Sequence, residues 1–323
     1  MRISGFSTST FGFRVGRQAI SYRDKRVWGP GDWGNTGRYT WDALKLLIDT
    51  ETVSTELIGA QRVISDKHTF DDTHFDFDAY GIYSQINKLP FALDLLYIFK
   101  YDDHGTTVDE SGIGDLESHS IGAYADGRFL ERWDWGGLAV YQFGNWGDDD
   151  IKALGSNERL GYTFDTAWKP RIGVEHSYGS GDDDPNDGDH KQFDGQFGAV
   201  DRFYGRMNMF AWMNLHDYQT SFSVKPKKNL DFSLDYHYLQ LAEEEDGWYY
   251  CHGKPIRQDP IGSSNDDLGH EVNLLANVEN QRAVRAVLGI FSLLGREFCA
   301  ADGRVRRRRL VLPTSDLLLL SAQ

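Results

Sequence analysis

Regular alternation between apolar and polar side chains is the feature of this sequence that most limits its possible folds. Residues 230–238 alternate Leu230 and Phe232 with Asp231 and Ser233. Successive side chains of a β-strand point to opposite faces of its sheet, so such a segment is predicted to be a strand with one apolar face. The same period of two recurs in the segments 75–83, 91–101, 135–143 and 272–278.

The chain of 323 residues contains roughly thirteen or fourteen such candidate strands, and several of them are 10–12 residues long. Strands of globular sheets usually have about 5–6 residues, whereas a tilted strand needs about 9–11 residues to cross a bilayer. We therefore expect an all-β fold, an antiparallel transmembrane β-barrel. A soluble all-β sandwich or barrel, whose strands also alternate, stays open as the alternative.

The predicted connections are of two kinds, as expected for a barrel with short turns on one rim and long loops on the other. Short turns are predicted at 87–88 and 227–229. Long, acidic loops are predicted at 103–116, 145–157, 180–200 and 242–267.

Hydropathy and charge agree with a barrel wall. The sequence has no run of 18 apolar residues, so a transmembrane helix is not expected. A mean hydropathy of −0.52 fits a wall in which only every second residue is apolar, and it fits a soluble β-protein equally well. The net charge of −15 hides a contrast, because residues 1–45 carry eight Lys/Arg against three Asp, while residues 101–200 carry 21 Asp/Glu against 7 Lys/Arg.

The most distinctive segment is 11–46, with a Gly-Arg-Gln unit at 16–18, a spaced Arg26 and a Trp-Gly-Asn unit at 33–35. Further blocks follow in order at 162–198, 201–217 and 268–278. Together these blocks resemble the alginate export family of bacterial outer-membrane proteins over about residues 10–293.

This resemblance implies a porin-like outer-membrane barrel of about eighteen strands that acts as a passive, anion-selective channel and not as an enzyme. The implied partners are outer-membrane lipid and an exported anionic polysaccharide such as alginate, drawn into a lumen lined by arginine and lysine. The resemblance places the substrate-binding positions of this lumen at Arg14, Arg17, Arg26, Arg38, Asp42, Arg171 and Arg206.

Electrostatics gives a reason for cations in the lumen. An arginine that faces lipid at the bilayer midplane costs about 2–4 kcal/mol, so arginines within spanning strands are expected to face inward. Arg14 alternates away from Phe11 and Phe13 and fits this expectation. Guanidinium groups bind carboxylates bidentately and stay charged. The alternative is that these arginines pair with lumen carboxylates and stiffen the wall, the candidates being Asp42, Asp76, Asp78 and Asp94.

Sequence motifs for metals, cofactors and catalysis are missing. The acidic loop 179–190 fails the EF-hand pattern, because with Gly188 at position six the third position is Pro185 and the twelfth is Asp194. We expect a solvated outer loop, and weak cation binding stays open. The sequence contains no HExxH, GxSxG, P-loop or CxxC pattern, so no enzyme, cofactor or metal centre is predicted.

The two ends depart from the family pattern. Residues 1–10 lack the apolar core of a signal peptide, so the sequence is interpreted as N-terminally truncated. Residues 1–294 are assigned to a partial barrel. Residues 295–323 contain the arginine run 306–309 and a leucine run, and they are predicted to be an aberrant non-barrel tail rather than a nucleic-acid-binding segment. Because unpaired strand edges cannot face lipid, we expect poor insertion of this chain.

Two other functions stay open. One is an uptake porin of the same fold for another anionic or aromatic compound, because a fold does not fix a substrate. The other is a soluble all-β carbohydrate-binding protein, which would have an apolar interior and no apolar outer belt. Contact with periplasmic export components also stays open, and nucleic acid is not an expected partner.

Overall fold

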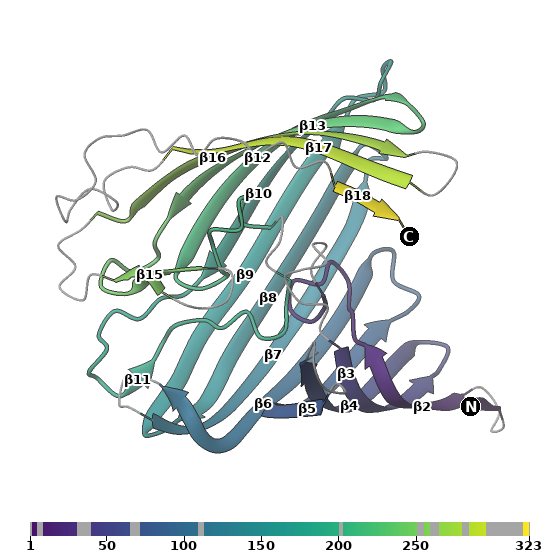
Figure 1. Ribbon diagram of the computed structural model, residues 1–323. Coiled ribbons are helices and arrows are strands. Elements are labelled where there is room, and N and C mark those ends of the chain that lie inside the picture. The colour runs from purple at the N-terminus through teal and green to yellow at the C-terminus, as the bar shows by residue number, and fades with distance from the viewer. Residues whose placement is uncertain are drawn as a thin grey trace.

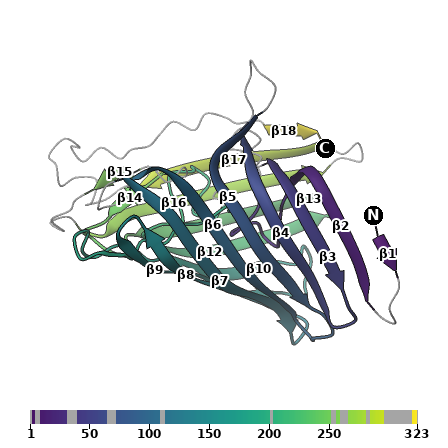
Figure 2. The same cartoon turned by 90° about the horizontal axis from the view of Figure 1, so that it is seen from below.

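A single large antiparallel sheet dominates this computed structural model and curves round into the wall of a barrel (Figures 1 and 2). The structure describes residues 2–4, 9–30, 40–64, 72–108, 113–199, 203–250, 255–258, 265–279, 284–294 and 319–322. It describes the side chains of residues 9–30, 40–63, 78–103, 114–199, 203–250, 255–258 and 265–278.

Each strand of the large sheet pairs with its neighbour along the chain, which gives the simple up-and-down order of a barrel wall. The strands of this path are β1 (Arg2–Ser4), β2 (Thr10–Ala19), β3 (Thr40–Asp49), β4 (Val53–Ile64), β5 (Asp72–Ile86), β6 (Ala92–Val108), β7 (Ile113–Phe129), β8 (Trp133–Trp146), β9 (Asp149–Thr163), β10 (Arg171–Gly179), β12 (Leu215–Lys227), β13 (Leu230–Gln240), β16 (Asp267–Glu279), β17 (Val284–Leu294) and β18 (Leu319–Ala322). Within the loops, β11 (Asp189–His190) pairs with β9, and β14 (Gly247–Tyr249) pairs with β15 (Pro255–Gln258).

The prediction of an all-β, barrel-type fold is confirmed. Among the described strands, β2 to β10, β12, β13, β16 and β17 each have nine or more residues, long enough for a tilted membrane strand. No described residue belongs to a helix that is long and apolar enough to cross a membrane. The edge strands β1 and β18 lie toward the same side of the molecule in both views, and no pair in the described part joins them.

The two faces of the sheet differ in the way that the alternation predicts. Large apolar side chains are exposed on the outer face, among them Ile121, Val174 and Leu274 at 49%, 53% and 47% exposure. The inner face carries buried polar side chains, such as Ser120 next to Ile121, and is covered by loops. A soluble sandwich would bury its apolar face instead, so this outer belt favours contact with lipid.

Two predicted long loops are wrong. The segment 103–116 is mostly strand, because β6 runs to Val108 and β7 begins at Ile113. The segment 145–157 is also mostly strand, because β9 begins at Asp149. These strands carry acidic residues toward their loop ends, where both faces can be solvated, so composition does not mark the true turns.

The structure describes four residues of the predicted C-terminal tail. Residues 319–322, predicted to lie outside the barrel, form the edge strand β18 and pair with β17 through Val284 and Ala322 at one end of the ladder. The remainder of the predicted tail, 295–318, lies outside the described residues.

Outer and inner positions should respond differently to an added charge. We expect Ile121→Arg to reduce the free energy of unfolding from lipid vesicles by about 2–4 kcal/mol, because it places a guanidinium against lipid. The matched control is Ser233→Arg, which adds the same side chain on the inner face beside Asp231 and Asp235 and should cost far less. Urea titration followed by heat-modifiable gel mobility measures both values. Equal losses in the two variants would contradict the assignment of faces.

Candidate functional site

The segment that follows β2 folds into the barrel instead of staying on the rim (Figure 1). We call residues 20–30 the inner loop. Backbone hydrogen bonds tie it to the connection between β10 and β12, with Gly29 N donating to Phe197 O at 3.0 Å and Phe197 N donating to Val27 O at 3.1 Å. Residues 191–199 and 203–214 of that connection form the second inner segment. The two segments together make up a plug that packs against the inner face of the sheet.

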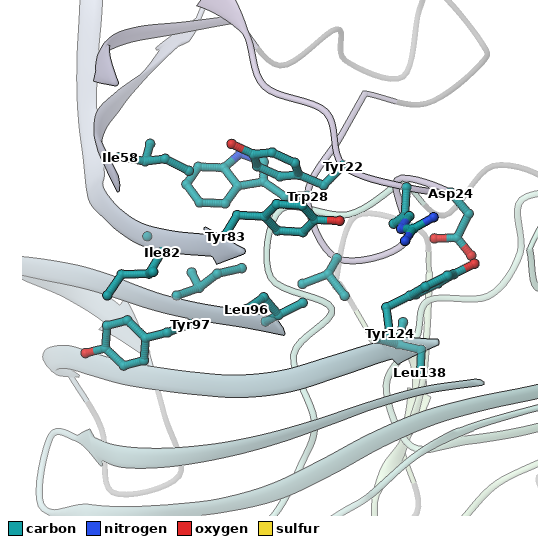
Figure 3. Close-up of a pocket in the computed structure, with 14 residues that line it drawn as sticks. Tyr22, Asp24, Trp28, Ile58, Ile82, Tyr83, Leu96, Tyr97, Tyr124 and Leu138 are labelled. Carbon is teal, nitrogen blue, oxygen red and sulfur yellow. The ribbon is translucent and has the colours of Figure 1, made fainter. Parts of the chain in front are cut away.

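Aromatic packing seats the plug against the wall. The Trp28 ring packs against both Trp41 and Phe197, with ring centroids 5.4 and 5.1 Å away, and Trp41 and Phe197 also contact each other at 4.8 Å. Tyr22 stacks on Tyr83 of β5 at 3.9 Å, beside a small apolar cavity (Figure 3). Gly81 leaves room for this arrangement, because a Cβ there would lie 2.9 Å from the Trp28 ring.

Ion pairs hold the first part of the inner loop to strands β3 to β7. The hydroxyl of Tyr22 donates to Glu56, which also accepts from Lys45 Nζ at 2.9 Å. Burial raises the pKa of Tyr22, and the hydrogen bond to Glu56 adds to this effect, so the phenol remains a donor. Arg23 Nη2 donates to Asp94 Oδ1 at 2.6 Å, and its Nη1 donates to Asp126 at 3.2 Å.

Arg26 joins the plug to the other side of the barrel. Its side chain is 2% exposed, donates to Glu175 Oε1 of β10 at 2.6 Å and lies 4.2 Å above the Phe203 ring. Asp24 accepts from Arg26 Nε at 3.4 Å and lies 3.6 Å from Arg159 Nη1 of β9. Arg26 is therefore a buried anchor of the plug.

A buried carboxylate anchors the second inner segment. Glu271 of β16 is 0% exposed, and its Oε1 accepts from the backbone N–H of Arg206 and, at 3.1 Å, of Met207. Gly205 has a φ of +87° and passes so close that a Cβ would collide with this carboxylate. Only glycine easily adopts this positive φ and also leaves room for the Glu271 carboxylate.

A basic basin lies inside the barrel at the short-turn end, next to the plug. It has a volume of about 780 Å³, and its lining includes four acidic residues, Asp126, Glu131, Asp134 and Asp165, and the aromatic residues Trp133, Trp135 and Phe164. Arg171 Nε donates to Asp134 Oδ2 at 3.0 Å and Nη2 donates to Oδ1 of the same carboxylate, a bidentate pair open to the basin. The cations that line the basin are Arg128, Arg132, Arg159, Lys169, Arg171 and Lys225.

The predicted site residues do not form one group. Arg14 pairs across strands with the inward Lys45 and so lies on the inner face. Arg26 is buried in the plug, Arg171 lines the basin, and Arg206 lies on the second inner segment. Arg38 lies outside the described residues.

Arg17 and Asp42, predicted to line the lumen, lie on the outer face. They form a bidentate ion pair at 2.9 and 3.0 Å, and Asp42 shares its face of β3 with the exposed Leu44. The reason is the period of two, because Arg17 is three residues from Arg14 and an odd separation reverses the face. The pair lies near the loop end of its strands, where charges on the outer face are tolerated.

The acidic loop 179–190 uses its carboxylates internally. Lys191 Nζ binds Asp183 and Asp187, and its ammonium lowers the pKa of Asp187. Asp182 accepts backbone N–H groups of the same loop. The described part of the chain contains no group of three or more potential metal ligands.

The plug residue Arg23 and five basin cations were not predicted as site residues, the basin cations being Arg128, Arg132, Arg159, Lys169 and Lys225. Alternation contains a usable signal for Arg159, which lies two residues from Asn157 and so faces the same side. The position of Arg23 has no such signal, because a loop has no period.

Comparison with known proteins agrees with this architecture. Residues 2–311 match the alginate export family, whereas no curated protein matches the chain. The family consists of transport channels and not of enzymes, which accords with a polar, partly plugged interior and an apolar outer belt. The chain thus belongs to the alginate export family of outer-membrane polysaccharide export channels.

Proposed function

We propose that this protein is an anion-selective channel that exports an anionic polysaccharide such as alginate, without catalysis, through a lumen lined by arginine. The observation that carries the proposal is the basic basin of about 780 Å³ at the short-turn end of the interior, in which six cationic side chains outnumber four carboxylates. Rings of charged side chains select ions of the opposite sign.

The pair of Arg171 and Asp134 illustrates how the basin would hold substrate. A guanidinium offers two parallel N–H donors that match a carboxylate, and Arg171 already presents this geometry to Asp134. A uronate carboxylate has the same shape and charge, so it can exchange with Asp134. Exchange of equivalent contacts allows a polymer to bind without becoming trapped.

The surroundings of the basin fit a membrane channel with partners on both sides. Outer-membrane lipid would cover the apolar outer face. Periplasmic export components would meet the short-turn rim, where Leu130 and Trp168 are 80% and 60% exposed. Both residues have positive φ values and lie in the tight turns of this rim.

A second candidate is an uptake porin for another anionic or aromatic compound. The small apolar cavity beside Tyr22 and Trp28 (Figure 3) favours it, because Arg23 is among the residues that line this cavity. The two candidates differ in ligand and in binding site. An aromatic acid would bind in the small cavity and compete with the stacking of Tyr22 on Tyr83, whereas a uronate polymer would occupy the basin.

Ion selectivity tests the basin directly. In a planar bilayer under a salt gradient, we expect a reversal potential that reports anion selectivity, and we expect Arg171→Gln to reduce it because Asp134 is left facing the basin unpaired. Arg17→Gln is the matched control, since its side chain lies on the outer face and its loss should leave selectivity unchanged. Cation selectivity of the unaltered protein would contradict the proposal.

Substrate affinity provides an independent test. We expect a mannuronate hexamer to block the conductance, and Arg171→Gln to weaken the block about tenfold or more, because a charge-assisted hydrogen bond contributes about 1.5–3 kcal/mol. Blocking should weaken as salt concentration rises. A neutral maltohexaose of the same length that blocked equally well would refute recognition through charge.

A further inference from the structure

Asp24 lies where the inner loop of the plug meets the wall of the basin. Its Oδ2 is 3.4 Å from Arg26 Nε within the inner loop and 3.6 Å from Arg159 Nη1 on the wall. The Asp24 side chain is only 17% exposed, so the two guanidinium groups and the packed loop surround its carboxylate. Figure 3 shows Asp24 next to Tyr124 at this boundary.

Arg159 faces both the plug and the basin. It lines the basin, and its Nη2 donates to the hydroxyl of Tyr124 at 2.6 Å. This hydrogen bond holds the guanidinium at the boundary independently of Asp24. Arg159 therefore stays available to a carboxylate in the basin when Asp24 moves away.

From this geometry we propose that Asp24 is an internal competitor for the substrate carboxylate at Arg159, so that substrate binding loosens the inner loop. The inference rests on the proposed function, because it assumes that a uronate polymer occupies the basin. The contact between Asp24 and Arg159 would set the substrate concentration at which the inner loop loosens from β9.

Charges stay paired through the exchange. When a uronate takes Arg159, Asp24 keeps its contacts with Arg26, whose backbone N–H donates to Asp24 Oδ1 at 3.1 Å. Arg26 also keeps Glu175, and Arg23 keeps Asp94. The exchange therefore removes one contact between the loop and the wall and leaves no buried charge without a partner.

The variant Asp24→Asn tests the competition in the refolded full chain. The amide has the same size as the carboxylate but no charge, so Arg159 becomes available to substrate. We expect a mannuronate hexamer to block at a concentration lower by about fivefold or more, the range of ordinary coupling between sites. Unchanged affinity in a variant that retains heat-modifiable mobility would overturn the competition.

Hydrogen exchange of the unaltered protein tests the loosening. We expect the hexamer to accelerate amide exchange in peptides covering residues 20–30, whose amides at Tyr22, Lys25 and Gly29 are hydrogen bonded in the plug. Maltohexaose should have no effect. Protection that stays the same or increases when the hexamer binds would overturn the coupling.

A control variant distinguishes general loosening of the plug from the specific availability of Arg159 to substrate. Glu56→Gln weakens the contact of Tyr22 with the wall but leaves Asp24 on Arg159. It should accelerate exchange in residues 20–30 without the increase in affinity expected of Asp24→Asn. An equal increase in both variants would show that general loosening controls binding and would overturn the specific role of Asp24.

The failure of this inference is distinguishable from failure of the proposed function. If the hexamer does not block the unaltered protein at all, the proposed function fails and the competition fails with it. If it blocks, and Arg171→Gln weakens the block while Asp24→Asn does not strengthen it, the export proposal stands and the role of Asp24 is refuted.

Discussion

Backbone hydrogen bonding is the constraint on which the rest of this structure depends. A chain that crosses a bilayer must pair its own N–H and C=O groups, because lipid offers no partners. Here a ladder of neighbouring strands from β1 to β18 supplies them. The same ladder fixes the side-chain period at two, so each strand has one face toward lipid and one toward the interior. The exposed belt that includes Ile121 and Val174 and the buried polar inner face follow from that separation.

An interior rich in charge then needs compensation, and the plug supplies part of it. Arg23 and Arg26 from the inner loop neutralise Asp94 and Glu175 of the wall. The two interpretations of lumen arginines apply to different residues. Arg26 is fully enclosed and acts as an anchor, whereas Arg171 pairs with Asp134 at the surface of the basin in which we propose that substrate binds.

The plug and the basin share one boundary, so the proposed binding of substrate is linked to the contacts that hold the plug. Arg159 contributes to both, with Tyr124 holding its guanidinium in place. A polyanion that binds the basin therefore acts on groups that also hold the inner loop. Ion pairs suit this role because one carboxylate can replace another with little cost in geometry.

The sequence by itself determined the strands, their faces and the family. The predicted strands 135–143, 230–238 and 272–278 lie within β8, β13 and β16, because alternation is a local property of the chain. Arg14 was correctly placed on the inner face for the same reason, and counting three residues further would have placed Arg17 outside. Only the tertiary structure decided the site, because Asp24 meets Arg159 across 135 residues of sequence and loops have no period from which such a contact could be read.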